Sequence, residues 1–294
     1  MATGQIMKAL SGFYYVLSDG ETYQCRGRGL FRKKKQTPLV GDHVIFDADN
    51  QSEGYLIELL PRKNELVRPP IANLDQVIIT VSAKEPDFST ALLDRFLTLV
   101  EANQIQPVIL VTKVDLVNEA EIGVLNDYIN YYRKIGYQVE VLSNKQKMTD
   151  SSSFTALFEN KISVIAGQSG VGKSSFLNLL DPNLALKTAE ISTSLGRGRH
   201  TTRHVELIDI CGGLVADTPG FSSLEFDTLE LEHLPSCFVE FSNYRSSCKF
   251  RGCMHINEPK CAVKEAVDRG DIASHRYQNY LQFYQEINLR KPRY

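Results

Sequence analysis

Residues 167–174 read Gly167-Gln168-Ser169-Gly170-Val171-Gly172-Lys173-Ser174, the complete pattern of a phosphate-binding P-loop. An apolar run at 162–166 precedes the motif and an apolar helical pattern follows it, which is the context that phosphate binding requires. The glycines let backbone N–H groups face the phosphates, and the start of the helix adds a partial positive charge. This context disfavours the alternative of a glycine-rich turn without a ligand.

Three side chains at the end of the motif carry its expected chemistry. Lys173 is predicted to neutralise β- and γ-phosphate oxygens, which makes it a catalytic as well as a binding residue. Ser174 is predicted to ligate Mg²⁺, and Ser175 to belong to the same phosphate-binding turn. The motif by itself predicts a nucleotide without saying which one.

A second motif indicates guanine. The residues Thr112, Lys113, Val114 and Asp115 directly follow an apolar run and are similar to the Asn-Lys-x-Asp guanine motif, with Thr112 in place of Asn. A carboxylate at Asp115 accepts hydrogen bonds from N1–H and N2–H₂ of guanine, and adenine lacks this pair of donors. The stem of Lys113 can cover the base. Without the P-loop a solvated strand end would be the favoured interpretation, and the Thr112 hydroxyl is expected to weaken the anchoring of the loop without abolishing it.

The order of the motifs predicts a rearranged domain. Asp217-Thr218-Pro219-Gly220 has the Asp-x-x-Gly form in which Asp217 would hold Mg²⁺ through water and the Gly220 N–H would sense the γ-phosphate. Alone, this tetrapeptide is equally compatible with an ordinary turn. An ordinary GTPase runs from P-loop to guanine motif, whereas here the guanine motif comes first. The sequence therefore predicts a circularly permuted G-domain, which surface loops and termini tolerate.

A cysteine and histidine cluster near the C-terminus predicts a metal. The spacing is Cys-x4-Cys-x-His-x5-Cys, formed by Cys248, Cys253, His255 and Cys261. Three thiolates and one imidazole fill a tetrahedral structural zinc site and leave no position for a catalytic water. The spacing is not the common paired Cys-x2-Cys form, so free thiols beside a surface histidine are the alternative. We predict one structural Zn²⁺ per chain.

Composition and charge exclude some classes of protein. The chain has 294 residues and a formal net charge of −2, which argues against a polycation that coats nucleic acid. The formal charge is +2 over residues 1–70, −8 over 71–239 and +4 over 240–294, which indicates different roles for these segments. No apolar run reaches the length of about 18 residues that a membrane span needs. The N-terminus also lacks the apolar core of a signal peptide, so we expect a cytoplasmic protein without a membrane partner.

The sequence patterns predict a multidomain chain of three parts. Residues 1–65 show short alternating strands and an Asp19-Gly20 hairpin turn, which predict an all-β OB-fold barrel that binds RNA. Residues 66–225 alternate short apolar runs with helical patterns, which is typical of the parallel α/β sheet of a G-domain. Residues 226–294 are predicted to form a mostly helical zinc-binding domain.

A basic segment lies within the predicted barrel. It contains six cations in ten residues: Arg26, Arg28, Arg32, Lys33, Lys34 and Lys35. OB-folds often bind oligonucleotides with such a loop and an aromatic face. For a run of charges alone, a solvated loop is the favoured interpretation, so RNA binding here is a hypothesis.

Taken together, the three parts resemble the RsgA (YjeQ/YloQ) family of circularly permuted GTPases of small ribosomal subunit assembly. The resemblance covers the whole chain through the barrel, the permuted motifs and the Cys-x4-Cys-x-His-x5-Cys module. It implies a protein that binds GTP, docks on a nearly mature small (30S) subunit and its rRNA, and is released by subunit-stimulated hydrolysis to GDP. We expect it to act as a monomer.

The resemblance also implies where the switch lies. The stretch 196–204 looks like the switch I of the family, in which Thr202 or Thr201 would close on Mg²⁺ and the γ-phosphate. Phe221 stands where many GTPases place a water-orienting Gln, and it cannot form that hydrogen bond. His200 matches the switch I histidine that is thought to serve instead.

Two other classes remain open at the level of sequence. A P-loop ATPase or small-molecule kinase would share the phosphate loop, but Asp115 and the stretch 196–204 argue against it. An RNA-binding scaffold could hold a nucleotide in a mainly structural role. Phosphate release on addition of small subunits would exclude the scaffold.

Overall fold

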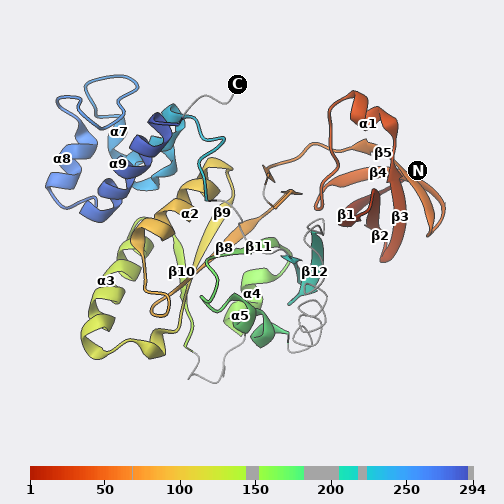
Figure 1. Cartoon of the computed structure of the whole chain (residues 1–294), viewed down its shortest axis with the longest axis horizontal. Coiled ribbons are helices and arrows are strands. Elements are labelled where there is room, and N and C mark those ends of the chain that lie inside the picture. Colours follow the sequence, from red (N-terminus) through yellow and green to blue (C-terminus); the bar gives the residue numbers. More distant parts are fainter. Residues whose placement is uncertain (68, 144–151, 182–204, 218–223, 291–294) are drawn as a thin grey trace. The chain divides into compact units, whose positions relative to one another are not determined.

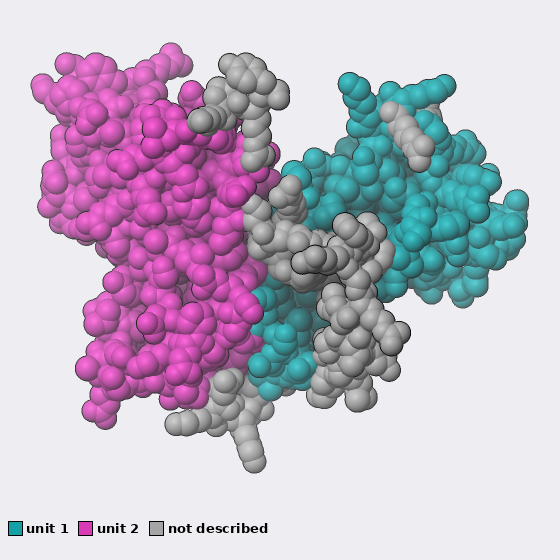
Figure 2. All heavy atoms as spheres, viewed as in Figure 1, with its two compact units in different colours: residues 1–77, 148–165, 173–222 teal, residues 78–147, 166–172, 223–294 magenta. Residues whose placement is uncertain are grey.

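The computed structural model describes residues 1–67, 69–143, 152–181, 205–217 and 224–290. The chain divides into two units, which Figure 2 colours separately: residues 1–77, 148–165 and 173–222 form the first, and residues 78–147, 166–172 and 223–294 the second. Among the described residues, no helix has the length and apolar character needed to cross a membrane.

The first unit begins with a closed five-stranded barrel of the OB type (Figure 1). Its strands pair in the order β1-β2-β3-β5-β4, and β4 closes the barrel by pairing with β1. Asp19 and Gly20 both have positive φ and form the predicted hairpin turn. The elements are β1 (Ala2–Leu10), β2 (Phe13–Ser18), β3 (Glu21–Gly27), α1 (Gly29–Lys33), β4 (His43–Asn50) and β5 (Glu53–Leu59).

In two strands of the barrel, one apolar residue fills the interior. In β2 the fully buried residue is Val16, whereas Phe13, Tyr15 and Leu17 are half-buried. In β5 it is Leu56, between positions that are partly or fully exposed. Both strands carry apolar residues on each face, so alternation alone does not identify the inner one.

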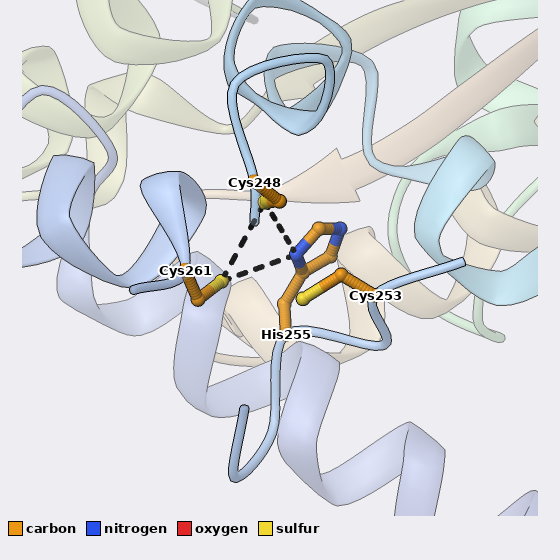
Figure 3. Close-up of side chains that lie close together, drawn as sticks. All are labelled: Cys248, Cys253, His255 and Cys261. Atoms are coloured by element: carbon orange, nitrogen blue, oxygen red, sulfur yellow. Dashed lines mark hydrogen bonds between the residues drawn. The ribbon is translucent and has the colours of Figure 1, made fainter. Parts of the chain in front are cut away.

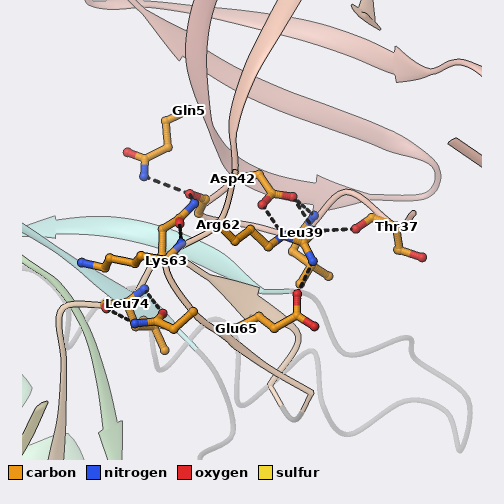
Figure 4. A network of polar contacts seen from close by, with 11 residues as sticks. Gln5, Thr37, Leu39, Asp42, Arg62, Lys63, Glu65 and Leu74 are labelled. Carbon is orange, nitrogen blue, oxygen red and sulfur yellow. Dashed lines mark hydrogen bonds and ion pairs between the residues drawn. The ribbon is translucent and has the colours of Figure 1, made fainter. Parts of the chain in front are cut away.

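An ion pair between a buried aspartate and a half-buried arginine holds the exit from the barrel (Figure 4). Asp42 is fully buried and accepts hydrogen bonds from Arg62 Nε at 2.7 Å, Arg62 Nη2 at 2.8 Å and the Leu39 N–H at 2.7 Å. Arg62 Nη2 also donates to the Thr37 carbonyl at 2.7 Å. These contacts fix the start of the connection between the barrel and the α/β part of the chain. Two short strands follow, β6 (Glu65–Leu66) and β7 (Ile71–Ala72).

The rest of the first unit is part of the α/β sheet. Strand β12 pairs with β1 of the barrel, and the sheet continues through β13 to β11. β13 is parallel to β11 and antiparallel to β12. Lys8 of β1 pairs with Glu206 of β12, and their side chains form an ion pair at 2.7 Å. The elements are α4 (Ser152–Phe158), β11 (Ile162–Ala166), α5 (Lys173–Leu180), β12 (Glu206–Ile210) and β13 (Gly213–Asp217).

The second unit contains a three-stranded part of the sheet in the order β10-β9-β8. β8 (Gln76–Ser82) is buried at every position, as expected of a strand that is covered on both faces. Ser89 caps α2 by accepting a hydrogen bond from the Leu92 N–H, and Asn118 caps α3 in a reciprocal capping box with Glu121. The other elements are α2 (Thr90–Ala102), β9 (Gln106–Thr112), the 3₁₀ helix η1 (Val114–Leu116), α3 (Glu119–Lys134) and β10 (Gln138–Val141).

The described residues 224–290 of this unit, which we call the C-terminal module, are mostly helical as predicted. The aromatic side chains of Phe238, Phe241, Tyr280 and Phe283 form the centre of its core. Tyr280 therefore belongs to the core. The elements are the 3₁₀ helices η2 (Leu231–Cys237) and η3 (Val239–Phe241), and helices α7 (Ser242–Arg245), α8 (Ala262–Asp268) and α9 (Ser274–Asn288).

A buried ion network joins the C-terminal module to α2. Arg276 of α9 donates to Glu240 through Nε at 2.7 Å and Nη2 at 2.9 Å, and to Asp94 Oδ1 of α2 at 2.7 Å. Tyr132 and Asn279 donate further hydrogen bonds to Asp94, both at 2.6 Å. Burial alone would lower the pKa of Arg276, but Asp94 and Glu240 raise it well above its ordinary value. The guanidinium is therefore charged and forms ion pairs with both carboxylates.

Candidate functional site

The P-loop lies between β11 and α5, as the sequence predicted. Gly167 has a φ of 142°, and a Cβ at this position would lie 2.2 Å from the Thr80 carbonyl oxygen of β8. Only glycine fits this close approach. Gly170 also has a positive φ, of 82°. The turn therefore needs its glycines for backbone geometry, which is what allows backbone N–H groups to converge on a phosphate.

A buried hydroxyl joins the guanine motif to the P-loop. Thr112 is 2% exposed at the end of β9, and its Oγ1 donates to the Val171 carbonyl at 2.6 Å. The two residues are 59 positions apart in the chain. The threonine thus forms a hydrogen bond of ordinary length to the phosphate loop, and it brings together two motifs that the sequence could only predict separately.

The other residues of the guanine motif have defined positions. Lys113 adopts a φ of 56°, and its Nζ donates to the Glu85 carbonyl. Val114 and Asp115 begin the 3₁₀ helix η1. Ser143 follows β10 and lies with its Oγ 3.4 Å from Asp115 Oδ1. Asp115 is half-buried, which leaves part of its carboxylate accessible to a ligand.

The first residues of α5 carry the remaining P-loop side chains, in the first unit. Lys173 is half-buried, and this burial lowers its pKa from the ordinary value. Ser174 and Ser175 are exposed, so their hydroxyls are accessible. Of the Asp-x-x-Gly motif, only Asp217 is described, as the last residue of β13 with its backbone opposite Glu206. Gly220, Phe221, His200, Thr201 and Thr202 lie outside the described residues.

The predicted metal ligands converge in the C-terminal module (Figure 3). Their ligand atoms all lie within 4.8 Å of one another. His255 Nδ1 is 3.3 Å from Cys261 Sγ and 3.7 Å from Cys248 Sγ, and the Cys248 and Cys261 sulfurs are 3.9 Å apart. A tetrahedral zinc with bonds of about 2.3 Å to sulfur has edges of about 3.8 Å. The Cys₃His donor set and its spacing therefore fit zinc.

Neighbouring groups hold the cluster in shape. The Glu258 carboxylate accepts from the N–H groups of Met254 at 2.7 Å and Ile256 at 2.8 Å. Tyr277 donates to the His255 carbonyl at 2.7 Å, and Phe241 contacts the imidazole edge-on at 5.5 Å. Burial lowers the pKa of His255, which favours the neutral, metal-binding form of the ring. These hydrogen bonds fix the backbone around His255 and so help to set where its ring lies.

Sequence reasoning missed the residues that follow β8. Residues 83–88, which we call the 83–88 loop, lie beside the guanine motif, and the Ala83 N–H donates to the Thr112 carbonyl at 2.9 Å. A signal was available, because ligands bind beyond the carboxyl ends of strands in open α/β sheets. β8 ends next to β9 in such a sheet, so Ser82 and the following residues were candidates.

Comparisons with known proteins cover the chain completely. Residues 3–56 match the RsgA N-terminal domain family, and residues 59–227 match the RsgA GTPase family. A protein of Geobacillus sp. (strain WCH70), named small ribosomal subunit biogenesis GTPase RsgA, is 61% identical over 294 residues, which is 100% of both chains. An Oceanobacillus iheyensis protein, small ribosomal subunit biogenesis GTPase RsgA 2, is 60% identical over the same length and coverage.

Two solved structures extend the likeness to the fold. The crystal structure of YloQ, described as a circularly permuted GTPase, superposes with a TM-score of 0.84 at 52% identity and covers 100% of this chain and 97% of its own. The crystal structure of YjeQ from Thermotoga maritima has a TM-score of 0.86 at 36% identity and covers 99% of both chains. The predicted fold class, including the circular permutation, is confirmed.

Proposed function

The chain belongs to the RsgA GTPase family, and on that premise we propose that it binds the small ribosomal subunit late in assembly, hydrolyses GTP and leaves with GDP. Its relatives carry the name small ribosomal subunit biogenesis GTPase, which supports this partner. Guanine nucleotide and Mg²⁺ follow from the family of GTPases. No observation on the described residues favours an ATPase, a kinase or a scaffold.

One observation supports the proposed nucleotide site above all others. The hydrogen bond from Thr112 to the Val171 carbonyl joins the guanine motif to the phosphate loop, and this contact supports a single nucleotide site formed by both motifs. A nucleotide in this site would have its base at Asp115 and its phosphates at residues 167–172. The site would then distinguish guanine from adenine through the Asp115 carboxylate, which would have no hydrogen-bond donors opposite it if adenine were bound.

The residues of the chain would divide the reaction between them. The backbone of residues 167–172 and Lys173 would bind the phosphates, and charge at Lys173 would stabilise the transferring group. Ser174, Thr202 and Asp217 would hold Mg²⁺, which supplies further charge neutralisation when it is bound. The N–H of Gly220 would contact the γ-phosphate. These steps need positioning and charge, and no covalent chemistry from the protein.

The attacking water needs a separate group. Phe221 lacks a hydrogen-bonding side chain, so we propose that His200 of the switch-like stretch 196–204 orients the water. Arg197, Arg199 and Arg203 lie in the same stretch and would pair with rRNA phosphates. Docking on the subunit would then place His200 and Thr202, which explains why hydrolysis should be slow until the subunit binds.

The C-terminal module would hold one zinc ion through Cys248, Cys253, His255 and Cys261. The Cys₃His donor set and the distances within the cluster support this assignment. A fourth protein ligand leaves no open coordination position, so the metal would be structural.

The proposed function is tested by phosphate release from GTP with and without purified small ribosomal subunits. Asp115→Asn is expected to lose GTP binding and gain binding of xanthosine triphosphate, because an amide can donate to the second carbonyl of xanthine. Unchanged GTP affinity in this variant would contradict the guanine site. Turnover that does not rise with added subunits would contradict the proposed partner.

The role of His200 has its own expected outcome. His200→Ala should reduce subunit-stimulated turnover by at least about tenfold, in line with the size of a lost catalytic contact, and leave GTP binding unchanged. Thr202→Ala should likewise lose turnover, with a smaller effect on GDP affinity. Stimulated turnover of His200→Ala equal to that of the parent would point to a catalytic group donated by the ribosome.

A further inference from the structure

We propose that the 83–88 loop is part of the guanine site, and that Ser82 is a positioning residue that acts through Lys113. The inference rests on the guanine site proposed above and adds residues outside the recognised motifs. The loop follows β8 directly, and β8 is the neighbour of β9, which leads into the guanine motif. The Ala83 N–H donates to the Thr112 carbonyl and continues the pairing of these strands beyond their ends.

Lys113 is the link between this loop and the nucleotide site. Its backbone is held in the left-handed region at a φ of 56°, and its ammonium donates to the Glu85 carbonyl. The side chain is therefore fixed at both ends. A stem that is fixed in this way offers a preformed apolar surface to a base, whereas a free lysine would lose side-chain entropy on binding.

Ser82 determines where the Glu85 carbonyl lies. It is 2% exposed at the end of β8, and its hydroxyl donates to the Pro86 carbonyl across the turn. The Pro86 ring also approaches the P-loop, with Cδ 4.0 Å from the Cβ position of Gly170. The buried hydroxyl thus sets the turn that carries the acceptor of Lys113, between the guanine motif and the phosphate loop.

Contacts with α3 hold the outer part of the loop. Lys84 Nζ lies 2.9 Å from both carboxylate oxygens of Glu121, and Phe88 stacks on Tyr128 at a ring distance of 5.6 Å. These contacts are exposed or half-buried and keep the loop against the helix that follows the guanine motif. Loss of the Ser82 hydroxyl should therefore shift the turn locally and leave the fold in place.

The test is a double-mutant cycle on GDP affinity in the full chain. Ser82→Ala and Lys113→Met are each expected to raise the Kd for GDP about threefold to tenfold, the size of one lost hydrogen bond. In the Lys113→Met background, Ser82→Ala should change the Kd by less than about twofold, since the contact it positions is already absent. Ser163→Ala is the matched control, because Ser163 is a buried serine whose hydroxyl accepts from Gln76 at 3.0 Å, at the other end of β8. It should leave the Kd unchanged.

A second variant covers the case in which Ser82→Ala fails to fold. Glu85 is exposed and has a φ of 57°, so Glu85→Gly suits the backbone while loosening the carbonyl. It should weaken GDP binding when Lys113 is present and have little effect in the Lys113→Met background. Additive effects, or an unchanged Kd in the single variants, would overturn the proposal. If Asp115→Asn also left GDP binding unchanged, the guanine site itself would be wrong.

Discussion

The nucleotide site and the C-terminal module are held together in different ways. In the nucleotide site, Thr112 bonds Val171 and Lys113 bonds Glu85, so each link is a single hydrogen bond to a backbone carbonyl between segments far apart in the chain. In the module, the four proposed metal ligands lie within residues 248–261, and Arg276 connects two buried carboxylates. The nucleotide site is thus held by hydrogen bonds that can be lost one at a time. The module is held by charged groups, and each of them is destabilising when a partner of opposite charge is removed.

The two regions should therefore respond differently to substitutions that remove one of these contacts. A typical hydrogen bond contributes about 1 kcal/mol, whereas a buried charge left without its partner costs about 3–5 kcal/mol. Changes in the nucleotide site should therefore weaken binding in steps. Changes in the charged centres of the module should instead remove much of its stability at once.

Metal removal should produce the largest effect. Without the proposed zinc, the Cys₃His cluster would lack the cation that balances its thiolates, and small metal-dependent modules often unfold under these conditions. Cys261→Ser, or a strong chelator, should abolish protection from hydrogen exchange in residues 224–290 while GTP binding persists. Metal analysis of the parent should find about one zinc per chain. Cys211→Ser, a cysteine outside the cluster, is the control, and a protected module without metal would contradict the assignment.

Loss of the buried guanidinium should produce the next largest effect. Arg276→Met leaves Asp94 and Glu240 buried without their cation, which should lower the free energy of unfolding by about 3–5 kcal/mol in urea titrations. Arg269→Met provides the comparison within the same module, because Arg269 forms an exposed ion pair with Asp271 at 3.0 Å. It should change stability by at most about 1 kcal/mol. If both variants lowered the free energy of unfolding equally, burial of the ion pair would not determine how much it stabilises the module.

Removal of the Thr112 hydroxyl should produce the smallest of the three effects. Thr112→Val keeps the volume and leaves the Val171 carbonyl without its donor, so the Kd for GDP should rise about tenfold, measured with a fluorescent GDP analogue. Thr112→Ser retains the hydroxyl and should stay within about threefold of the parent. If both variants bound GDP as tightly as the parent, the two motifs would not depend on this hydrogen bond.

Some local structures could be predicted from the sequence, because only a few residue types fit their backbone geometry or their ligand. The Asp19-Gly20 turn was confirmed, because its positive φ angles limit which residues fit. The P-loop glycines and the spacing of Cys248, Cys253, His255 and Cys261 belong to the same class. The domain limits and the roles of the site residues stay predictions.

Strands of the barrel were less predictable. Ala2–Leu10, which forms β1, lacks a regular alternation of apolar and polar residues, so its pattern does not mark the limits of a strand. In β2, residues 13–17 are all apolar, so either face could point inward. The closure of the barrel through β1 and β4 places Val16 inside, and that choice depends on strands distant in the sequence.

The sequence by itself determined the chemistry of this protein: a P-loop, a guanine motif that precedes it, and a Cys₃His cluster, each contained in a short segment. Only the tertiary structure decided how these segments are supported. Thr112 meets Val171, Lys113 meets Glu85, and Arg276 meets Asp94 across 182 positions. The physical reason is that a motif records which groups a ligand needs, whereas a supporting contact depends on which strands and helices become neighbours, and that is a property of the whole fold.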